Sequence, residues 1–442
     1  MLQTLINAFK VKEIRNKVFM MLLLLLVFRI GCFVPVPGLN RDAFSSVIEG
    51  NDFLNLMSSI TGGALAQGTI FALGIGPYIN ASIIMQLLSV GIPALERLSK
   101  QGEEGRKKIA QYTRYATIML ALVQSIGIIV SYGGSQNAIN YSLFGGEEGA
   151  GKLLAGAFMA IVYTAGAFIV MWLGERITDY GVGNGQSMII FVGILSTAGQ
   201  AIVDQFSIVF AGGDEASTAI WGLVAFALVA AVIFFAIVYV DLSERKVPVQ
   251  YAKQIKGRKM YGGQSSAIPI RISGGGVMPL IFSFSILSFP QMLASMFWPG
   301  SAFETWWTKW MSAAAEWPRV IVYTLVLCIL IFAFSFFYAQ MQFNPEDVSK
   351  SIQQNGGFIQ GIRPGKATEA YLKKISNRIT LFGAIYLSLV AFIPSVAFAW
   401  ANLALVNVFS TTGILIIVSV SMEFEKQLQA QLMMKNYKGF LK

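Results

Sequence analysis

The chain has 442 residues, of which 55% are hydrophobic and only 13% are charged, and its formal net charge is +10. A soluble domain is nearer to about 25% charged, so this composition excludes an ordinary water-soluble protein and indicates apolar surface that faces lipid. The chain contains no histidine, which removes the commonest general base and metal ligand. The basic excess is compatible with nucleic-acid binding or with membrane topology, and the positions of the charges decide between the two.

The N-terminal region predicts a surface helix followed by a first membrane span. Four apolar residues share one helical face, which suits a short helix lying on the membrane: Leu2, Leu5, Ile6 and Phe9. The apolar run at 18–28 follows four basic residues, as in a signal peptide, but no small-residue cleavage site comes after it. We therefore expect a retained span, with Arg29 near its outer end and its side chain extended to the interface.

Residues 53–95 form a charge-free window that is too long for one crossing. A continuous helix over 43 residues would be about 65 Å long, whereas the hydrocarbon core is about 30 Å thick. Only one crossing is compatible with the basic loop that follows. We predict a short re-entrant piece at 53–67 and a spanning helix at 69–90, loosened by Pro77. A helix at 53–67 lying flat on the outer leaflet remains the alternative.

The other charge-free windows complete ten spans. The last window, 379–422, crosses twice with its turn at Pro394 and Asn402, because basic segments flank it on both sides. With the N-terminus in the cytoplasm, 28 of the 33 Lys and Arg residues fall on the cytoplasmic side, and so does the C-terminus. The basic excess thus serves topology rather than nucleic-acid binding. We predict an all-α polytopic membrane protein with ten transmembrane helices.

The polar residues within the predicted spans are mainly amides and hydroxyls. Amides of this kind bridge helices or line a path for water: Asn80, Gln86, Gln124 and Gln186. The sequence lacks the paired acids or His/Glu sets of an intramembrane enzyme, and its glycine-rich stretches lack the lysine of a phosphate-binding loop. We expect a passive conduit without enzyme activity, cofactor or metal. A small-molecule secondary transporter, which would need a polar or charged midplane site, is the alternative function.

Two predicted cytoplasmic loops, 241–271 and 339–378, are long for connectors. The first indicates a β-hairpin with basic residues along it and at its tip: Arg245, Lys246, Lys256 and Arg258. In the second, Arg363 lies among turn residues that would present its guanidinium rigidly to a partner's carboxylate or phosphate: Gly361, Pro364 and Gly365. Neither loop is large enough for a catalytic domain, so both are candidate partner-binding sites.

Seven short motifs, in one order between residue 29 and about residue 425, resemble the SecY family of bacterial protein-export channels. They occupy 62–65, 71–79, 111–115, 172–175, 183–185, 251–253 and 361–365. Each motif alone is weak, but seven in register, each on the expected side of a span, are specific. The resemblance implies two inverted five-helix halves around a central pore, at 1–210 and 211–442.

The resemblance also implies three sets of pore residues. A plug at about 53–67 would include Met57, Ser58, Ile60, Thr61, Gly62 and Gly63. The pore ring would consist of Ile75, Ile79, Gln186, Ile190, Ile281 and Ile416. Stiff, branched isoleucines can close a pore by dewetting, and Gln186 departs from the apolar residue expected there. A lateral gate would lie between the spans at 69–90, 115–132, 272–297 and 320–338, with Asn80, Gln86 and Gln124 as its polar residues.

Function and partners follow from the same resemblance as expectations. Such a channel moves unfolded preproteins across the membrane and releases hydrophobic segments, including signal sequences, sideways into lipid. The implied partners are SecE and SecG subunits, the SecA motor ATPase and the ribosome, with nucleic acid involved only through ribosome docking. Arg363 matches the arginine that couples the channel to SecA. The implied location is the bacterial plasma (inner) membrane, with both termini in the cytoplasm.

Overall fold

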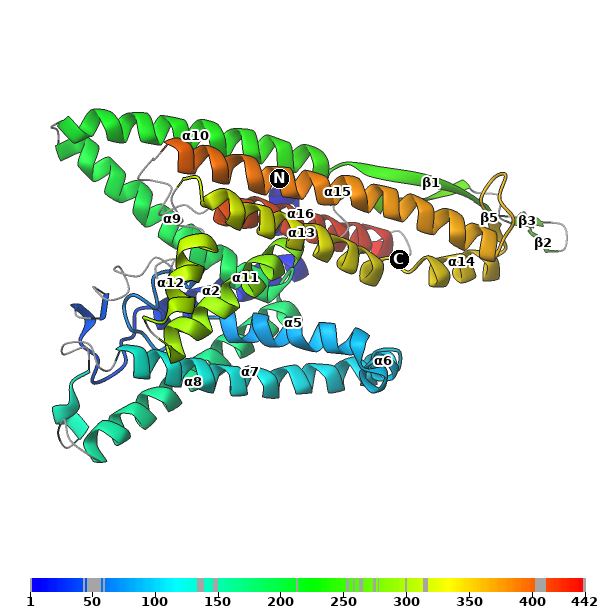
Figure 1. Ribbon diagram of the computed structural model, residues 1–442. Coiled ribbons are helices and arrows are strands. Elements are labelled where there is room, and N and C mark those ends of the chain that lie inside the picture. The colour runs from blue at the N-terminus through cyan, green and yellow to red at the C-terminus, as the bar shows by residue number, and fades with distance from the viewer. Residues whose placement is uncertain are drawn as a thin grey trace.

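The computed structural model describes residues 2–42, 44–45, 57–58, 60–132, 139–144, 146, 150–211, 214–251, 254–256, 259–261, 265–272, 276, 278–298, 300–312, 317–401 and 411–439. These residues form a helical bundle that carries a small β-sheet at one end (Figure 1). Helices lie at all ten predicted spans: α2 (Lys12–Gly31), α5 (Gly76–Gly91), α7 (Glu103–Tyr132), α8 (Ala150–Tyr180), α9 (Gly185–Ala211), α10 (Asp214–Asp241), α11 (Met278–Phe297), α13 (Val320–Gln342), α15 (Lys366–Ala401) and α16 (Thr411–Gly439).

Length and composition qualify most of these helices as membrane spans. Within the described ranges seven of them are long and apolar enough to cross a bilayer, or eight if α5 and the sharply bent α6 (Pro93–Ser99) count as one span. Of the other two positions, α2 has charged residues near both ends, and α16 is described only from Thr411, inside its predicted window. The helical architecture is therefore as predicted, and ten crossings are consistent with it.

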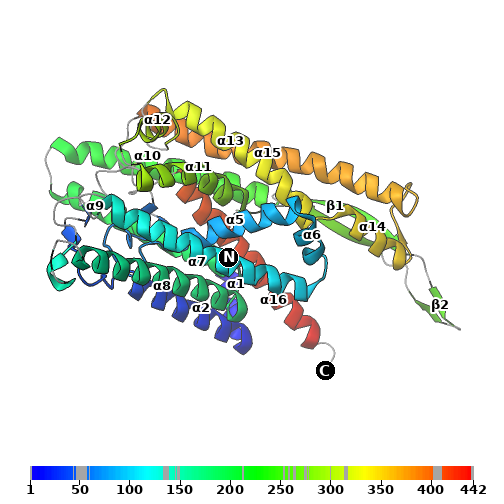
Figure 2. The same ribbon diagram turned by 60° about the horizontal axis from the view of Figure 1, so that its bottom comes forward.

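The bundle has two groups of helices with two connecting helices between them. Helices α5, α7 and α8 pack together, as do α10, α13, α15 and α16 (Figure 1 and Figure 2). Helix α11 contacts α5 and α7 on one side and α13 on the other, and α9 contacts both α8 and α10. The interface that α5 and α7 make with α11 and α13 is called the seam below.

Both ends of the chain lie together. Helix α1 (Leu2–Lys10) packs against α16, where the Thr4 hydroxyl donates a hydrogen bond to Glu425 at 3.4 Å. Apolar residues from α1, α2, the 181–184 turn and α16 share one buried cluster, which includes Ala8, Val182 and Leu428. The structure therefore puts both termini on one side of the bundle, as the charge distribution predicts.

The predicted hairpin is present and has a third strand that the sequence did not reveal. Strand β1 (Glu244–Tyr251) pairs antiparallel with β4 (Ser265–Arg271), and β2 (Gln254–Lys256) pairs with β3 (Lys259–Tyr261) beyond them. Strand β5 (Gly357–Phe358), from the second long loop, adds to the free edge of β1 and gives the order β4-β1-β5. The two long loops are thus one structural unit.

A separate core supports this unit. Val247 and Val249 are buried at alternate positions of β1, as the two-residue period of a strand requires. They pack with Ile352 of α14 (Pro345–Gln354) and with Leu372 of α15. The sheet is therefore fixed to the end of α15 that extends beyond its apolar stretch.

Three sequence-based boundaries are wrong. The helix predicted at 69–90 begins only at Gly76, because 61–75 form a chain of turns. Helix α7 begins at Glu103, so much of the basic loop before 115 is helical. Pro394 is no turn, since α15 continues through it to Ala401, and Asn402 lies outside the described residues. Residues 300–312, after α11, contain a further short helix, α12 (Ala302–Trp310).

Candidate functional site

Residues 57–75 enter the bundle as a short helical piece, described at Met57, Ser58 and Ile60, that continues into a chain of turns over 61–75. Among their described members, Ala64 and Thr69 are fully buried, and Ser58 and Thr61 nearly so. A helix lying flat on the outer leaflet would be exposed along one face, so this burial excludes that alternative for the described residues. The segment runs inward through protein, which is the setting in which irregular backbone is tolerated at membrane depth.

Short hydroxyl side chains satisfy the backbone of this segment. The Ser58 hydroxyl accepts from the Ala66 amide at 3.1 Å, and the Thr61 hydroxyl donates to the Ser58 carbonyl at 3.0 Å. The Thr69 hydroxyl donates to the carbonyl of Ala64 at 3.1 Å. These bonds replace the helical ladder that the turns lack, and so they lower the cost of burying polar backbone groups.

Arg29 of α2 holds the segment by its backbone. Its guanidinium donates a hydrogen bond to the carbonyl oxygen of Gly62 at 2.8 Å, and it also lies 4.9 Å from the centroid of the Phe33 ring. The side chain is half-buried. The expectation that Arg29 merely extends to the membrane interface is therefore wrong. A lone cation within an apolar span was the available signal, and its partner could not be identified from sequence.

Glycines bring the same segment into backbone contact with α9. A Cβ added to Gly193 would lie 2.5 Å from the carbonyl oxygen of Ile60, closer than real contacts allow. Gly62, with φ +73, faces the same glycine: a Cβ there would lie 3.1 Å from its Cα. Only glycine fits at both positions. Met57, Ile60 and Gly63, the other described residues predicted for the plug, are partly exposed.

Five isoleucines predicted for the pore ring meet in one buried cluster. They come from four separate parts of the chain, and none is more than 8% exposed: Ile75, Ile79, Ile190, Ile281 and Ile416. Phe282 and Tyr338 belong to the same cluster, with ring centroids 5.1 Å apart. Half of the buried side chains in this cluster are branched at Cβ, the five isoleucines among them, and such side chains are stiff.

Gln186, the sixth predicted position, borders this cluster and is half-buried. Its backbone N–H donates to the Asn184 side chain at 3.1 Å. Its Cγ and the Cδ1 of Ile75 both lie within 3.5 Å of the point where a Cβ on Gly174 would stand. The glutamine is therefore close to Ile75, against α8.

One hydrogen bond crosses the seam between helices that are far apart in sequence. The Tyr338 hydroxyl of α13 donates to Oε1 of Gln86 on α5 at 2.5 Å, and Gln86 Nε2 donates to Ser82 at 3.0 Å. On α7, Gln124 is 4% exposed, and its Nε2 has no hydrogen-bond partner. Asn80 is half-buried on α5. Tyr338 was not predicted, since nothing in an apolar run distinguishes one tyrosine as a partner.

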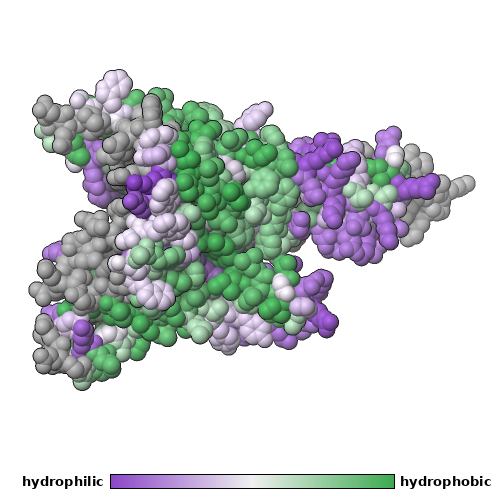
Figure 3. Space-filling view, in the orientation of Figure 1, coloured by the Kyte–Doolittle hydropathy of each residue, from purple (hydrophilic) through white to green (hydrophobic). Residues whose placement is uncertain are grey.

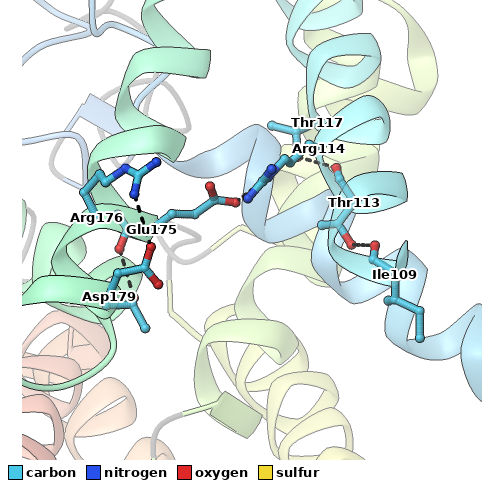
Figure 4. A network of polar contacts seen from close by, with 9 residues as sticks. Ile109, Thr113, Arg114, Thr117, Glu175, Arg176 and Asp179 are labelled. Atoms are coloured by element: carbon cyan, nitrogen blue, oxygen red, sulfur yellow. Dashed lines mark hydrogen bonds and ion pairs between the residues drawn. The ribbon is translucent and has the colours of Figure 1, made fainter. Parts of the chain in front are cut away.

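Two motifs that are distant in sequence are joined near one end of α7 and α8. Figure 4 shows the Arg114 guanidinium directed at the Glu175 carboxylate, with Nε 2.8 Å from Oε1. Arg176 turns the other way, toward Asp179, at 3.6 Å. The Arg114–Glu175 ion pair therefore joins α7 to α8.

The second long loop presents Arg363 at the surface. Gly361 and Gly365 have φ of +79 and +98, so both turns need glycine, and the Thr368 hydroxyl donates to the Arg363 carbonyl at 2.9 Å. Gly361, Arg363 and Pro364 line a pocket of about 630 Å³ together with Phe358. The backbone of the loop is fixed, while the guanidinium is exposed.

The predicted basic residues of the hairpin are less completely described. Arg245 and Lys246 are exposed on β1, and Lys246 lies 3.3 Å from Glu244. Lys256 belongs to β2, and Arg258 lies outside the described residues. Figure 3 shows hydrophilic side chains over the end of the molecule that holds the sheet and α14.

Comparisons with known proteins agree on one family. The family model described as SecY matches residues 69–425. Protein translocase subunit SecY of Streptomyces coelicolor is 40% identical, with 100% of both chains covered. A solved structure described as "The structure of a protein conducting channel" matches with a TM-score of 0.68 at 20% identity, over 94% of this chain and 92% of that one. Sec61 in the canine ribosome–channel complex matches with a TM-score of 0.64 at 19% identity, over 94% and 92%.

Proposed function

This chain belongs to the SecY family, and from that premise we propose how its parts work as a protein-conducting channel. Its full-length relatives are translocase subunits, so the chain is a translocation channel and not an enzyme. The alternative function, a small-molecule secondary transporter, is therefore excluded. The observation that carries the mechanism is the meeting of Ile75, Ile79, Ile190, Ile281 and Ile416 in one buried cluster.

The isoleucine cluster is the constriction of the closed channel. An unfolded polypeptide has no fixed side-chain pattern, so an apolar constriction serves every sequence, whereas a polar site would select among them. Branched aliphatic groups exclude water and ions when they close. Gln186, beside Ile75, is the one polar member of the ring, and it faces the translocating chain when the ring opens.

Residues 53–67 are the plug. Burial of Ser58 and Thr61, the Arg29–Gly62 hydrogen bond and the Gly193 contact support this role, since they hold irregular backbone beside the isoleucines. The plug seals the side of the constriction opposite the cytoplasm.

The seam is the lateral gate through which signal sequences and hydrophobic segments reach lipid. Its support is the hydrogen bond between Tyr338 and Gln86, which joins its two sides through side chains. A side-chain contact of this kind separates without distorting a backbone. Gln124 of α7, whose Nε2 has no hydrogen-bond partner among the described residues, is the amide that the family resemblance implies for this gate. Residues 1–210 and residues 211–442 form two inverted halves. These two halves move apart when the gate opens.

Partners supply the energy and the substrate. The joined loops form one docking surface, on which the exposed Arg363 engages the SecA motor and the basic hairpin with Arg245, Lys246, Lys256 and Arg258 engages the ribosome. SecE and SecG complete the complex in the bacterial plasma membrane, with both termini in the cytoplasm.

Cross-linking tests the constriction. A cysteine in place of Ile79 should form a disulfide with a cysteine in a preprotein stalled in the channel, because the chain passes through the ring. Ile84→Cys is the matched control on the same helix, since that side chain is 39% exposed on the surface of the bundle. Equal adduct yields at the two positions would count against the ring.

Motor-driven export tests the docking surface. Arg363→Glu should stop export driven by SecA, while Lys373→Glu, an equally exposed charge reversal on α15, should leave it nearly unchanged. Normal export by the Arg363 variant would remove this residue from the coupling.

A further inference from the structure

A second pocket lies at the start of β1, and it shares only Arg245 with the docking surface proposed above. It has a volume of about 470 Å³ and opens between the start of β1, residue Ile272 and α15. Three of its lining residues are basic and exposed: Arg245, Lys374 and Arg378. Its apolar part is made by Ile272, Ile379 and Phe382. The pocket therefore has a cationic part and an apolar part.

The three basic side chains of this pocket have no ion-pair partner among the described residues of the chain. Its one acidic lining residue, Glu244, already contacts Lys246 at 3.3 Å. The described residues provide no ion-pair partner for Arg245, Lys374 or Arg378. Three like charges around one hollow repel each other, so the arrangement favours an anion.

The pocket lies at the polar–apolar boundary of three spans. Arg378 is the last charged residue before the charge-free run 379–422, and Arg271 is the last before 272–303. Helix α10 ends at Asp241, two residues before the pocket begins. In Figure 3 the hydrophilic end of the molecule meets its broad hydrophobic flank. The cations thus lie at the depth of lipid headgroups.

The surface of α15 next to the pocket is apolar and exposed. On α15, Phe382 is 57% exposed, and its neighbours Leu381 and Ile385 are 47% and 45% exposed. Those side chains face hydrocarbon in a membrane-spanning helix, so a ligand that fits the pocket combines an anionic head with an apolar tail.

We propose that this pocket binds the headgroup of one anionic phospholipid from the leaflet on the basic side of the protein. The guanidinium groups of Arg245 and Arg378 donate to the phosphate oxygens, Lys374 adds a point charge, and an acyl chain lies over Phe382. Because Arg245 is on β1 and Arg378 on α15, one phosphate ties the cytoplasmic sheet to its span. This role goes beyond translocation itself.

Native mass spectrometry of the purified full-length chain tests the proposal with phosphatidylglycerol and phosphatidylcholine of identical acyl chains. The wild type should keep one phosphatidylglycerol in preference to phosphatidylcholine. Each cation at a membrane surface contributes about fivefold, so Arg245→Gln with Arg378→Gln should weaken phosphatidylglycerol binding by about thirtyfold. Lys366→Gln with Lys373→Gln, which removes the same charge from α15 outside the pocket, should change it by less than about twofold.

Further arms separate the alternatives. Phe382→Ser should weaken phosphatidylglycerol binding without changing charge, and inorganic phosphate in millimolar excess should not displace the lipid. Arg245→Lys with Arg378→Lys should recover most of the binding, which a merely structural role would not allow. The proposal is overturned by an equal loss in the Lys366 and Lys373 control, by displacement with phosphate, which indicates a soluble anion, or by failure of the lysine variant.

Discussion

The plug segment and the seam border the same isoleucine cluster but are held in opposite ways. The plug is held by backbone: Arg29 binds a carbonyl, and Gly193 lets α9 touch the backbone of Ile60. The seam is held by side chains, with one hydrogen bond from Tyr338 to Gln86 and ring contacts around Phe282. One closure depends on shape and the other on exchangeable contacts.

This difference indicates that the two closures are energetically separable. Backbone in close contact cannot slide, so a small steric change displaces the plug as a whole. A side-chain hydrogen bond can be replaced by one to water or to an entering segment at a net cost of about 1 kcal/mol. Variants of the plug should therefore change ion leak through the channel, and variants of the seam should change the distance across it.

Gly193→Val should have the largest effect. Its Cβ would lie 2.5 Å from the Ile60 carbonyl oxygen, and overpacking of this kind costs about 3 kcal/mol, which corresponds to about a hundredfold shift toward a displaced plug. Ion conductance of reconstituted bilayers should rise accordingly. Gly199→Val is the control on the same helix, because nothing lies within 4 Å of a Cβ there. Similar conductance in the two variants would show that the contact does not hold the plug.

Arg29→Gln should have the next largest effect on conductance. The lost bond joins a charged donor to a carbonyl, which is worth about 1.5 kcal/mol at a half-buried site, or about a tenfold rise in open-plug population. Arg41→Gln is matched to it, since Arg41 binds Gln67 of the same segment at 2.7 Å but at the exposed surface. The seam distance should stay constant in both variants. A change in the seam distance with Arg29→Gln would contradict the inference that the two closures are energetically separable.

Tyr338→Phe should act on the seam alone. Loss of its hydrogen bond to Gln86 costs about 1 kcal/mol, so the population with a wide seam should rise about fivefold. Spin labels at the exposed positions Leu87 and Met341, on α5 and α13, measure that population. Tyr163→Phe removes a buried hydroxyl that has no partner, and it should change nothing. Equal widening in both variants would assign the effect to packing.

Sequence patterns predicted the helices that form the seam better than the segment proposed as the plug, for a physical reason, whereas a gate between those helices was implied only by the family resemblance. The distribution of charges between the two sides of the membrane, together with the charge-free runs, indicates which helices cross the bilayer. The alternation of Val247 and Val249 indicates the hairpin. Hydropathy cannot distinguish a helix from buried irregular backbone, so the apolar run at 61–75 was assigned partly to a helix. Gly74, with φ +55, was the local signal that it is not one.

Contacts between distant segments were beyond the reach of these patterns. The match of Gly193 to Ile60 depends on a backbone approach that leaves no periodicity in either segment. Strand β5 has only two residues, too few for any pattern. The isoleucines were located by resemblance to a family rather than by spacing, because an apolar residue inside an apolar span carries no mark of its role.

The smallest expected effect concerns charges at the end of the seam near α6 and α14. Lys100, next to α6, forms an ion pair with Glu96 at 2.7 Å and also attracts Glu346 and Asp347 in the first turn of α14. A hydrogen bond with Lys350 and then the nearby lysine charges lower the pKa of Glu346 below its ordinary value of 4.5. Only the attraction of Lys100 changes when the seam opens, because Lys350 lies on the same helix as Glu346. This attraction makes the pKa of Glu346 lower in the closed form than in the open form. It therefore stabilises the closed form above the open-form pKa, and the contribution is lost as pH falls through the closed-form pKa.

The distance across the seam should therefore be constant between about pH 6 and pH 8 and should widen only below about pH 4.5. These groups are fully exposed, so salt should screen most of the attraction. Lys100→Gln should abolish the salt dependence of the Leu87–Met341 distance, whereas Lys350→Gln should leave the part due to Lys100, because Lys350 is on the same helix as Glu346. A salt dependence that survives in Lys100→Gln would mean that charges other than Lys100 act across the seam.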